Sequence, residues 1–170
     1  ISTNIVNIFG IKIGKDRKKD ILNKCFNALK SQKNGKPLFV VTLNPEILLA
    51  SRKDLKYKKI INSFKLKLID GFGIKLIGWL KKKPISDRIT GADLAEILFK
   101  KAEKLGLSIG IVFNKNGLSS EKEIRKIFKK NKQINFLGIE RKDQKPDLKK
   151  IENSHLILVG LGHPEQEKFI

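Results

Sequence analysis

The stretch Leu38-Phe39-Val40-Val41-Thr42-Leu43-Asn44-Pro45-Glu46 decides the fold class, because an apolar run ends abruptly in polar residues and a proline. A short run of β-branched and aromatic residues that is bounded by Gly and Pro is typical of a buried strand. Asn44 is suited to cap a following helix, and Pro45 fits its first position, where proline costs no hydrogen bond. We therefore predict a strand over 38–42 that passes directly into a helix.

Two later stretches repeat this arrangement of a strand followed by a polar loop. Leu66–Ile69 runs into Asp70-Gly71-Phe72-Gly73, and Leu156–Val159 runs into Gly160-Leu161-Gly162-His163-Pro164-Glu165-Gln166-Glu167. The carboxyl ends of parallel strands meet at one edge of a sheet, where open α/β folds bind their ligands. The sequence therefore predicts one cleft that is lined by all three loops and suited to a phosphate-bearing ligand.

The rest of the chain alternates between strand and helix patterns. Apolar stretches on either side of Gly10 predict a small strand pair over 5–13. Helices are predicted over 16–31, 55–64, 74–80, 92–105, 120–130 and 146–153, and further strands over 108–113 and 134–139. Such alternation is typical of an α/β fold with a parallel sheet. We expect a doubly wound, mostly parallel, Rossmann-like sheet with a small N-terminal strand pair.

Length and composition fit one globular domain over residues 1–170, of which 40% are hydrophobic. The single cysteine, Cys25, excludes an intrachain disulfide and fits a reducing compartment. No apolar run approaches the about 18 residues of a membrane-spanning helix. The chain begins at Ile1 without a methionine and stops at Ile170 just as a helix starts, so we expect it to be truncated.

The net charge is +20, and only five of the 37 basic residues are arginine. An A/T-rich genome, which favours Lys, Ile and Asn codons, is one explanation for this composition. The other is physical, because such a surface attracts anions such as nucleic acid, anionic lipid or a nucleotide-sugar.

Polar side chains in the first two loops have a functional and a structural reading. Thr42 and Asn44 lie where the N–H groups of a helix start could bind a diphosphate or sugar oxygen, but an ordinary helix cap would use the same residues. Asp70 follows a buried strand and could act as a general base, or it could cap the helix that starts near Gly73. Each loop by itself leaves both readings open.

Arg88 and the last loop complete the candidate site. The planar guanidinium of Arg88 matches a phosphate, although Arg88 could also pair with Asp87 or Asp93. Gly160 and Gly162 allow a tight turn, and Gln166 is expected in the first turn of the following helix, facing the cleft. Glu replaces the third glycine of the dinucleotide-binding motif, and two histidines without nearby cysteines are too few for zinc, so we expect neither a nicotinamide cofactor nor a metal.

Four motifs in this order resemble one family. They are Thr-Leu-Asn-Pro-Glu over 42–46, Asp-Gly-Phe-Gly over 70–73, Arg-Ile-Thr-Gly-Ala-Asp-Leu over 88–94 and Gly-Leu-Gly-His-Pro-Glu-Gln-Glu-Lys-Phe over 160–169. Together they resemble the WecG/TagA/CpsF glycosyltransferases, from about Ile5 to the last residue. The resemblance implies an inverting, metal-independent hexosyltransferase without a cofactor. It would move N-acetylmannosamine, or a related N-acetylated sugar or its uronic acid, from a UDP-sugar to N-acetylglucosamine on undecaprenyl diphosphate, in teichoic acid or other cell-surface polysaccharide synthesis.

The resemblance also implies roles for individual residues. Asp70 would be the catalytic base, Thr42 and Asn44 would hold the donor sugar or the acceptor, and Arg88 would stabilise the departing diphosphate. Gln166 would contact the sugar, and Gly71, Gly160 and Gly162 would form substrate-binding loops. The protein would work in the bacterial cytoplasm, peripherally on the inner face of the membrane, without a nucleic-acid partner, and a homo-oligomer is compatible with this role. The resemblance also implies a C-terminal appendage, which we expect to be missing from these 170 residues.

Two alternatives remain open at this point. A basic α/β domain of this charge could bind nucleic acid, although arginines are scarce and the chain has one Tyr and one Trp. A family member could also bind a nucleotide-sugar without catalysis. Phe113-Asn114 stand where the family usually has Gly-Gly, and Glu140-Arg141-Lys142-Asp143 replace a stretch that often contains His, Gly and an aromatic residue.

Overall fold

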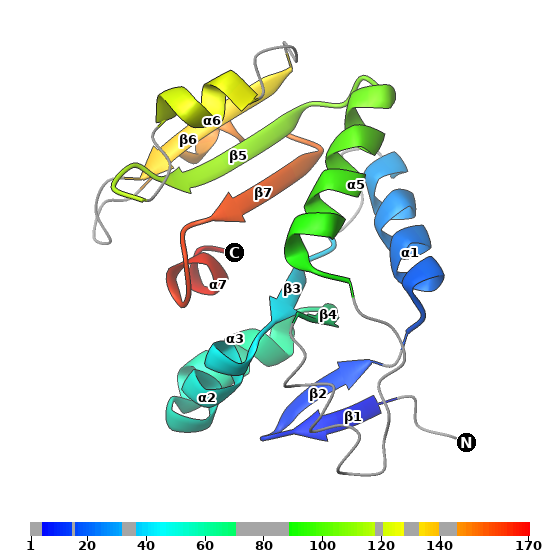
Figure 1. Cartoon of the computed structure of the whole chain (residues 1–170), viewed down its shortest axis with the longest axis vertical. Helices are drawn as coiled ribbons and strands as arrows, with labels where there is room; N and C mark the ends of the chain where they lie inside the picture. Colours follow the sequence, from blue (N-terminus) through cyan, green and yellow to red (C-terminus); the bar gives the residue numbers. More distant parts are fainter. Residues whose placement is uncertain are drawn as a thin grey trace. The chain divides into compact units, whose positions relative to one another are not determined.

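A computed structural model describes residues 5–14, 16–31, 37–70, 89–117, 121–127, 133–139 and 146–170. The chain divides into two compact units. The first comprises Ile1–Lys30, Gly35–Leu94 and Ile170, and the second comprises Ser31–Asn34 and Ala95–Phe169. Figure 1 shows the elements of both units in chain order.

The first unit contains the predicted N-terminal strand pair. β1 (Ile5–Ile8) and β2 (Ile11–Gly14) are antiparallel, and Val6 lies opposite Ile13. Phe9 and Gly10 form the turn with positive φ angles of 51° and 86°, and the N–H of Gly10 donates to Oδ1 of Asn7 over 2.8 Å. Alternate residues of both strands are buried, so one face of this hairpin packs on the core.

The opening stretch forms the strand and helix that its sequence predicts. β3 (Val40–Leu43) pairs in parallel with β4 (Leu66–Ile69), and Leu43 lies opposite Ile69. The helices of this unit are α1 (Lys18–Lys30), α2 (Pro45–Lys53) and α3 (Leu55–Ser63). The main core of the unit joins the hairpin, β3, β4 and the apolar faces of α2 and α3; it contains Val6, Ile8, Ile11, Ile13, Val41, Leu43, Ile47, Leu48, Tyr57, Ile61, Phe64 and Ile69.

The second unit is built around a buried central strand. β5 (Ile109–Asn114) pairs in parallel with β6 (Ile134–Ile139) on one side and β7 (Leu156–Gly160) on the other, as Figure 1 shows. Its helical elements are α5 (Gly91–Lys104), which begins in the first unit, α6 (Glu121–Ile127), η1 (Leu148–Lys150) and α7 (Glu165–Phe169).

The two faces of β5 are both covered by hydrophobic side chains. Ile109, Ile111 and Phe113 pack with residues of α5 and α6, including Phe99 and Ile124. Val112 points the other way and packs with Leu137, Ile151 and Phe169. A strand that is buried on both faces has a continuous run of apolar residues in its sequence. Residues 109–113 have this pattern.

Most predicted elements are confirmed to within about two residues. The helix predicted over 74–80 lies outside the described residues, and so do 120 and 128–130 at the ends of the helix predicted over 120–130. The short helix predicted over 146–153 is confirmed only in part, because the 3₁₀ helix η1 covers three of these residues. Asp147 caps that turn through a 3.2 Å bond from the N–H of Lys149, and burial of Ile151 then draws the chain toward β7.

The mixed α/β class and the parallel pairing of strands are confirmed. The sequence predicts a more specific architecture than these two features define. The described strands form three sheets, with the orders β1-β2, β3-β4 and β6-β5-β7. A single doubly wound sheet and a single catalytic domain over residues 1–170 stay predictions.

Candidate active site

The candidate site of the first unit lies at the carboxyl ends of β3 and β4. Thr42 is the third residue of β3, and Asp70 directly follows β4. The N–H of Asp70 donates to the carbonyl oxygen of Leu43 over 2.7 Å, which continues the parallel ladder by one bond. The two strand ends therefore hold Thr42 and the Asp70 carboxylate on neighbouring strands at one edge, as predicted.

The third part of this site is the N-terminus of α5. Thr90 caps the helix, because its Oγ1 accepts from the N–H of Asp93 over 3.0 Å and its carbonyl accepts from Leu94. The N–H of Gly91, the first helical residue, donates to Oδ2 of Asp70 over 3.0 Å. Since the first N–H groups of a helix have no partner inside it and carry partial positive charge, they suit a carboxylate.

Asp70 does have a structural role, at the helix that begins at Gly91, 21 residues further along the chain. The helix expected near Gly73 lies outside the described residues, so capping of that helix by Asp70 stays a prediction. The bond from the N–H of Gly91 does not compete with the functional reading. A carboxylate that is half-buried and held by a backbone N–H keeps a fixed position at the strand edge, as a general base requires.

Gly91 is a residue that our sequence reasoning missed. A Cβ at this position would lie 2.9 Å from Oγ1 of Thr42 and 3.6 Å from Oδ2 of Asp70. The missing side chain is what lets the start of α5 approach both residues closely. The signal was the Thr-Gly pair directly before an amphipathic helix, but its partner across the fold was not visible in the sequence.

Asn44 has the capping role. It is the N-cap of α2, where its Oδ1 accepts from the N–H of Ile47 over 2.8 Å. The cap uses the oxygen of the side-chain amide and does not involve Nδ2. Asn44 also follows the last residue of β3, so its position at the strand edge is confirmed, while substrate binding stays a prediction.

The predicted residues Gly160, Gly162 and Gln166 belong to the second unit. Gly160 ends β7 opposite Phe113, and Gly162 has a φ of +79°, in the region that favours glycine. A cis peptide bond joins His163 to Pro164, and α7 follows. The N–H of Gln166 donates to the carbonyl of Gly162 over 3.0 Å, so this loop and the start of α7 form one local structure.

Glu167 is a second residue that the sequence analysis missed. Its side chain is only 2% exposed, and its Oε1 accepts from Nε2 of Gln166 over 2.6 Å. Nδ1 of His163 lies 3.8 Å from Oε2 of the same carboxylate. A buried carboxylate thus orients the Gln166 amide. The four-residue spacing of His163 and Glu167 was the available signal.

Two predicted site residues, Gly71 and Arg88, lie outside the described residues. Asp70 and Gln166 belong to different units. A cleft that joins the two sets of residues therefore stays a prediction.

One charged group near the start of β4 has an altered pKa. Lys67 donates from Nζ to the carbonyl oxygens of Asn62, over 3.2 Å, and Phe64, at the end of α3. Desolvation by burial lowers the pKa of Lys67 below its ordinary value. Lys67 also lines a hollow with Asp16, Ile69 and Ile89, and its bonds to the end of α3 give it a structural role.

The whole described chain matches a known family. Residues 6–170 match the glycosyl transferase WecG/TagA/CpsF family, and the chain belongs to this family. Within the parts of the chain that the structure describes, no helix has both the length and the apolar character needed to cross a membrane.

Three curated relatives are 27–31% identical to this chain over the residues that align. The chain is 31% identical over 141 residues, or 80% of its length, to a protein of Bacillus spizizenii named N-acetylglucosaminyldiphosphoundecaprenol N-acetyl-beta-D-mannosaminyltransferase. Proteins of the same name from Bacillus subtilis and Staphylococcus aureus are 30% identical over 77% and 27% identical over 86% of the chain. The alignments cover 54%, 53% and 58% of these relatives, so the chain spans about half their length.

Proposed function

We propose that the intact protein transfers N-acetylmannosamine, or a closely related N-acetylated sugar or its uronic acid, from a UDP-sugar to N-acetylglucosamine on undecaprenyl diphosphate. Family membership and the names of the relatives support this activity. The structural observation that carries it is the convergence of Thr42, Asp70 and the Gly91 N–H at the carboxyl ends of two parallel strands. This is the place where α/β folds bind substrates.

Asp70 would act as the base of a single displacement. Its carboxylate would take the proton of the acceptor hydroxyl as that oxygen attacks the anomeric carbon of the donor sugar. The bond between the anomeric carbon and the diphosphate oxygen breaks, and UDP leaves with the electron pair. One attack from the opposite face inverts the anomeric centre, so the mechanism requires one carboxylate and not two.

The other predicted residues would bind the substrates and the leaving group. Thr42 and Asn44 would contact the donor sugar or the acceptor, while Gly71 and Arg88 would receive the diphosphate, where negative charge develops. Gly160 and Gly162 would form a substrate-binding loop, and Gln166 would contact the sugar. This arrangement requires one catalytic domain in which the parallel strands act as a single doubly wound, Rossmann-like sheet.

Gly91 would be a positioning residue for the base. Its N–H fixes one oxygen of Asp70, which leaves the carboxylate with a defined direction toward the acceptor. An acceptor that is linked to undecaprenyl would bring the protein to the inner face of the cytoplasmic membrane as a peripheral protein.

The test is transfer from UDP-N-acetylmannosamine to a lipid-diphosphate N-acetylglucosamine analogue by the intact protein. Asp70→Asn keeps an oxygen that can accept from Gly91 but is not a base, so turnover should fall by about 10²-fold or more while the fold persists. Asp93→Asn is the matched control, because Asp93 is an exposed acid in the first turn of α5. Near-parental turnover of Asp70→Asn would refute the assignment of the base.

A further inference from the structure

The solvent-facing side of α2 and α3 carries leucines where an ordinary surface helix carries polar residues. We define the α2–α3 face as Leu49, Lys53, Leu55, Lys56 and Lys59. Leu49 is 52% exposed and Leu55 is 69% exposed, and all three lysines are exposed. Single exposed leucines are common on protein surfaces, so the argument depends on what surrounds these two.

Helical spacing places these residues on one side of each helix. On α2, Leu49 and Lys53 are four residues apart, and they lie opposite the buried Ile47, Leu48 and Ser51. On α3, Leu55 and Lys59 have the same spacing, with Lys56 beside them, and they lie opposite the buried Tyr57 and Ile61. Core packing therefore does not account for either leucine.

Asp54 fixes the corner between the two helices. Its N–H donates to the carbonyl of Ala50 over 2.9 Å, which ends α2. Its Oδ1 accepts from the N–H groups of Lys56 and Tyr57 over 2.8 and 3.0 Å, which starts α3. Since one residue ends the first helix and caps the second, their exposed sides are held in a fixed relation.

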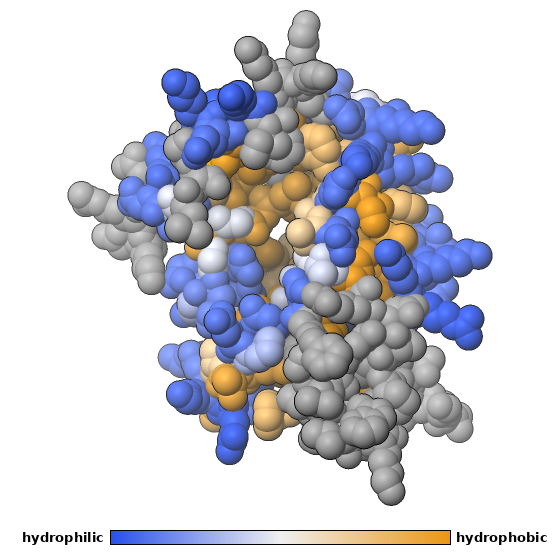
Figure 2. Space-filling model, in the orientation of Figure 1, coloured by the Kyte–Doolittle hydropathy of each residue, from blue (hydrophilic) through white to orange (hydrophobic). Residues whose placement is uncertain are grey.

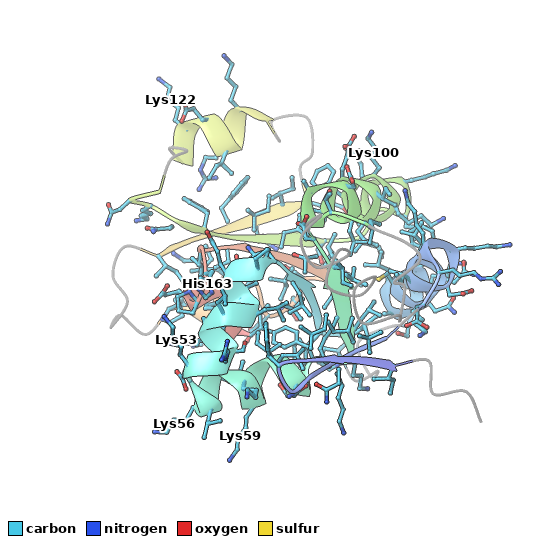
Figure 3. All side chains as sticks on the ribbon, turned by 60° about the horizontal axis from the view of Figure 1, so that its bottom comes forward. Lys53, Lys56, Lys59, Lys100, Lys122 and His163 are labelled. Carbon is cyan, nitrogen blue, oxygen red and sulfur yellow. The ribbon has the colours of Figure 1, made fainter. Side chains whose placement is uncertain are left out.

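The net charge of this segment is positive. Residues 49–59 contain five basic residues, and Asp54, which caps α3, is the single acidic residue among them. Figure 3 shows Lys53, Lys56 and Lys59 together on the α2–α3 side, pointing away from the ribbon. Figure 2 shows hydrophobic side chains exposed among hydrophilic ones over the same two helices, at its lower left.

The turn of the β1–β2 hairpin extends the apolar part of this region. The guanidinium of Arg52 lies 5.5 Å from the centre of the Phe9 ring, and Phe9 is itself 37% exposed. The stem of Lys58 lies beside Gly10, because a Cβ added there would be 3.4 Å from its Cδ. Exposed apolar and basic side chains from three consecutive elements are therefore held together.

We infer that the α2–α3 face binds the surface of an anionic phospholipid bilayer, with Leu49 and Leu55 inserted between headgroups and the lysines paired with lipid phosphates. Apolar side chains flanked by lysines, with basic residues outnumbering the acidic Glu46 and Asp54 of the same two helices, match this partner in both charge and polarity. A nucleic acid would use the lysines but would not explain the two exposed leucines.

This inference deepens the proposed function, since it rests on an acceptor that is carried by a membrane lipid. α2 begins at Asn44, beside the candidate site, and ends at the α2–α3 face. A helix of nine residues is about 13 Å long. The face would therefore hold the strand edge of the first unit within about one helix length of the headgroups, where a lipid-linked diphosphate lies.

The direct test is sedimentation of the chain with vesicles of phosphatidylcholine and phosphatidylglycerol in a 7:3 ratio (roughly the charge density of an anionic leaflet). We expect binding that decreases with salt. Leu49→Ser with Leu55→Ser should lower the partition coefficient about tenfold. Each substitution removes the free energy that is gained when part of a leucine side chain is buried in the membrane. Lys53→Gln, Lys56→Gln and Lys59→Gln together should lower it about 100-fold, or roughly fivefold for each lysine.

Matched variants elsewhere on the surface control for hydrophobicity and total charge. Leu105 and Leu148 are 42% and 51% exposed, so Leu105→Ser with Leu148→Ser removes similar apolar area. Lys122→Gln, Lys149→Gln and Lys150→Gln remove the same charge from other exposed positions. Urea unfolding of every variant reports whether it remains folded.

Three outcomes would overturn the inference. The first is vesicle binding that Leu49→Ser with Leu55→Ser does not alter. The second is control variants that weaken binding as much as the test variants do. The third is a change of self-association in sedimentation equilibrium, instead of a change of vesicle binding, when both leucines are replaced. The intact protein with the leucine pair should still transfer sugar to a short-chain, water-soluble acceptor. If the unsubstituted intact protein did not transfer sugar to this acceptor, the proposed function would be contradicted. The vesicle experiment tests the α2–α3 face alone.

Discussion

β4 of the first unit and β7 of the second are both apolar strands that run into a glycine-containing loop. The polar side chains of these two loops are held by different kinds of contact. Asp70 is fixed by the N–H of Gly91, which lies 21 residues away in the sequence. Gln166 is fixed by its neighbour Glu167 and by the carbonyl of Gly162, within one short loop. The difference teaches that the first strand edge depends on the docking of a distant helix, while the second is a local structure that its own residues define.

The largest loss of turnover in this comparison is expected from a substitution at Gly91. Gly91→Ala should favour the helix by about 0.5–1 kcal/mol. The new Cβ would lie 2.9 Å from Oγ1 of Thr42, however, and such overpacking costs about 1–3 kcal/mol. We expect the clash to dominate, with about 1 kcal/mol of net destabilisation and at least about tenfold lower turnover as Asp70 loses its fixed position. Urea unfolding and the transfer assay measure the two effects.

The control for Gly91→Ala removes the Oγ1 atom of Thr42, with which the new methyl group would clash. Thr42→Ala deletes both Oγ1 and Cγ2, the two atoms of Thr42 that lie near the added methyl group. The double variant should regain the stability that Gly91→Ala alone loses. An equal loss in the single and the double variant would show that the contact with Thr42 is not the cause.

The local structure of the second unit should break at Glu167. Glu167→Ala removes the partner of the Gln166 amide and leaves a cavity, so we expect a loss of about 1–3 kcal/mol and a KM for the donor about tenfold higher. Glu167→Gln retains an oxygen acceptor and should recover most of the KM. If KM stayed unchanged in Glu167→Ala, the Gln166 amide would have no role in donor binding.

Two helix caps of the first unit give a matched pair of smaller effects. Asn44 caps α2 beside the candidate site, and Asp54 caps α3 at the opposite end of α2. Asn44→Ala and Asp54→Ala should each lower the free energy of unfolding by about 1 kcal/mol. Only Asn44→Ala should also reduce sugar transfer. Similar losses of transfer in both variants would mean that Asn44 acts through stability alone.

The smallest effect concerns pH and the buried thiol of α1. Burial raises the pKa of Cys25 above its ordinary value of 9.0, so the unfolded chain loses this proton first as the pH rises. The stability that the neutral thiol contributes is complete below pH 9 and is lost as the pH rises through the higher folded pKa. Urea unfolding at pH 8 and 10 should show a steeper loss for the parent than for Cys25→Ala. Parallel losses would contradict this.

Sequence patterns predicted the elements well because each depends on neighbours in the chain. The alternation of buried residues in β1 and β2, the Asn44-Pro45 helix start and the stop of α5 at Gly106, with φ +65°, are all local choices. The short helix predicted over 146–153 has a smaller extent in the structure, for the opposite reason. Its three-residue turn is set by the burial of Ile151 in the second unit, which no local pattern reports.

The sequence by itself determined the family, the parallel strands and the position of Asp70 at a strand end, because motif order and hydrophobic periodicity are properties of the chain. The tertiary structure decided which group holds Asp70, why position 91 has no side chain, and that Glu167 is buried beside Gln166. These depend on contacts between distant segments or on burial. The physical reason is that a hydrogen bond needs its donor and acceptor within about 3 Å, and only the packed chain sets that distance.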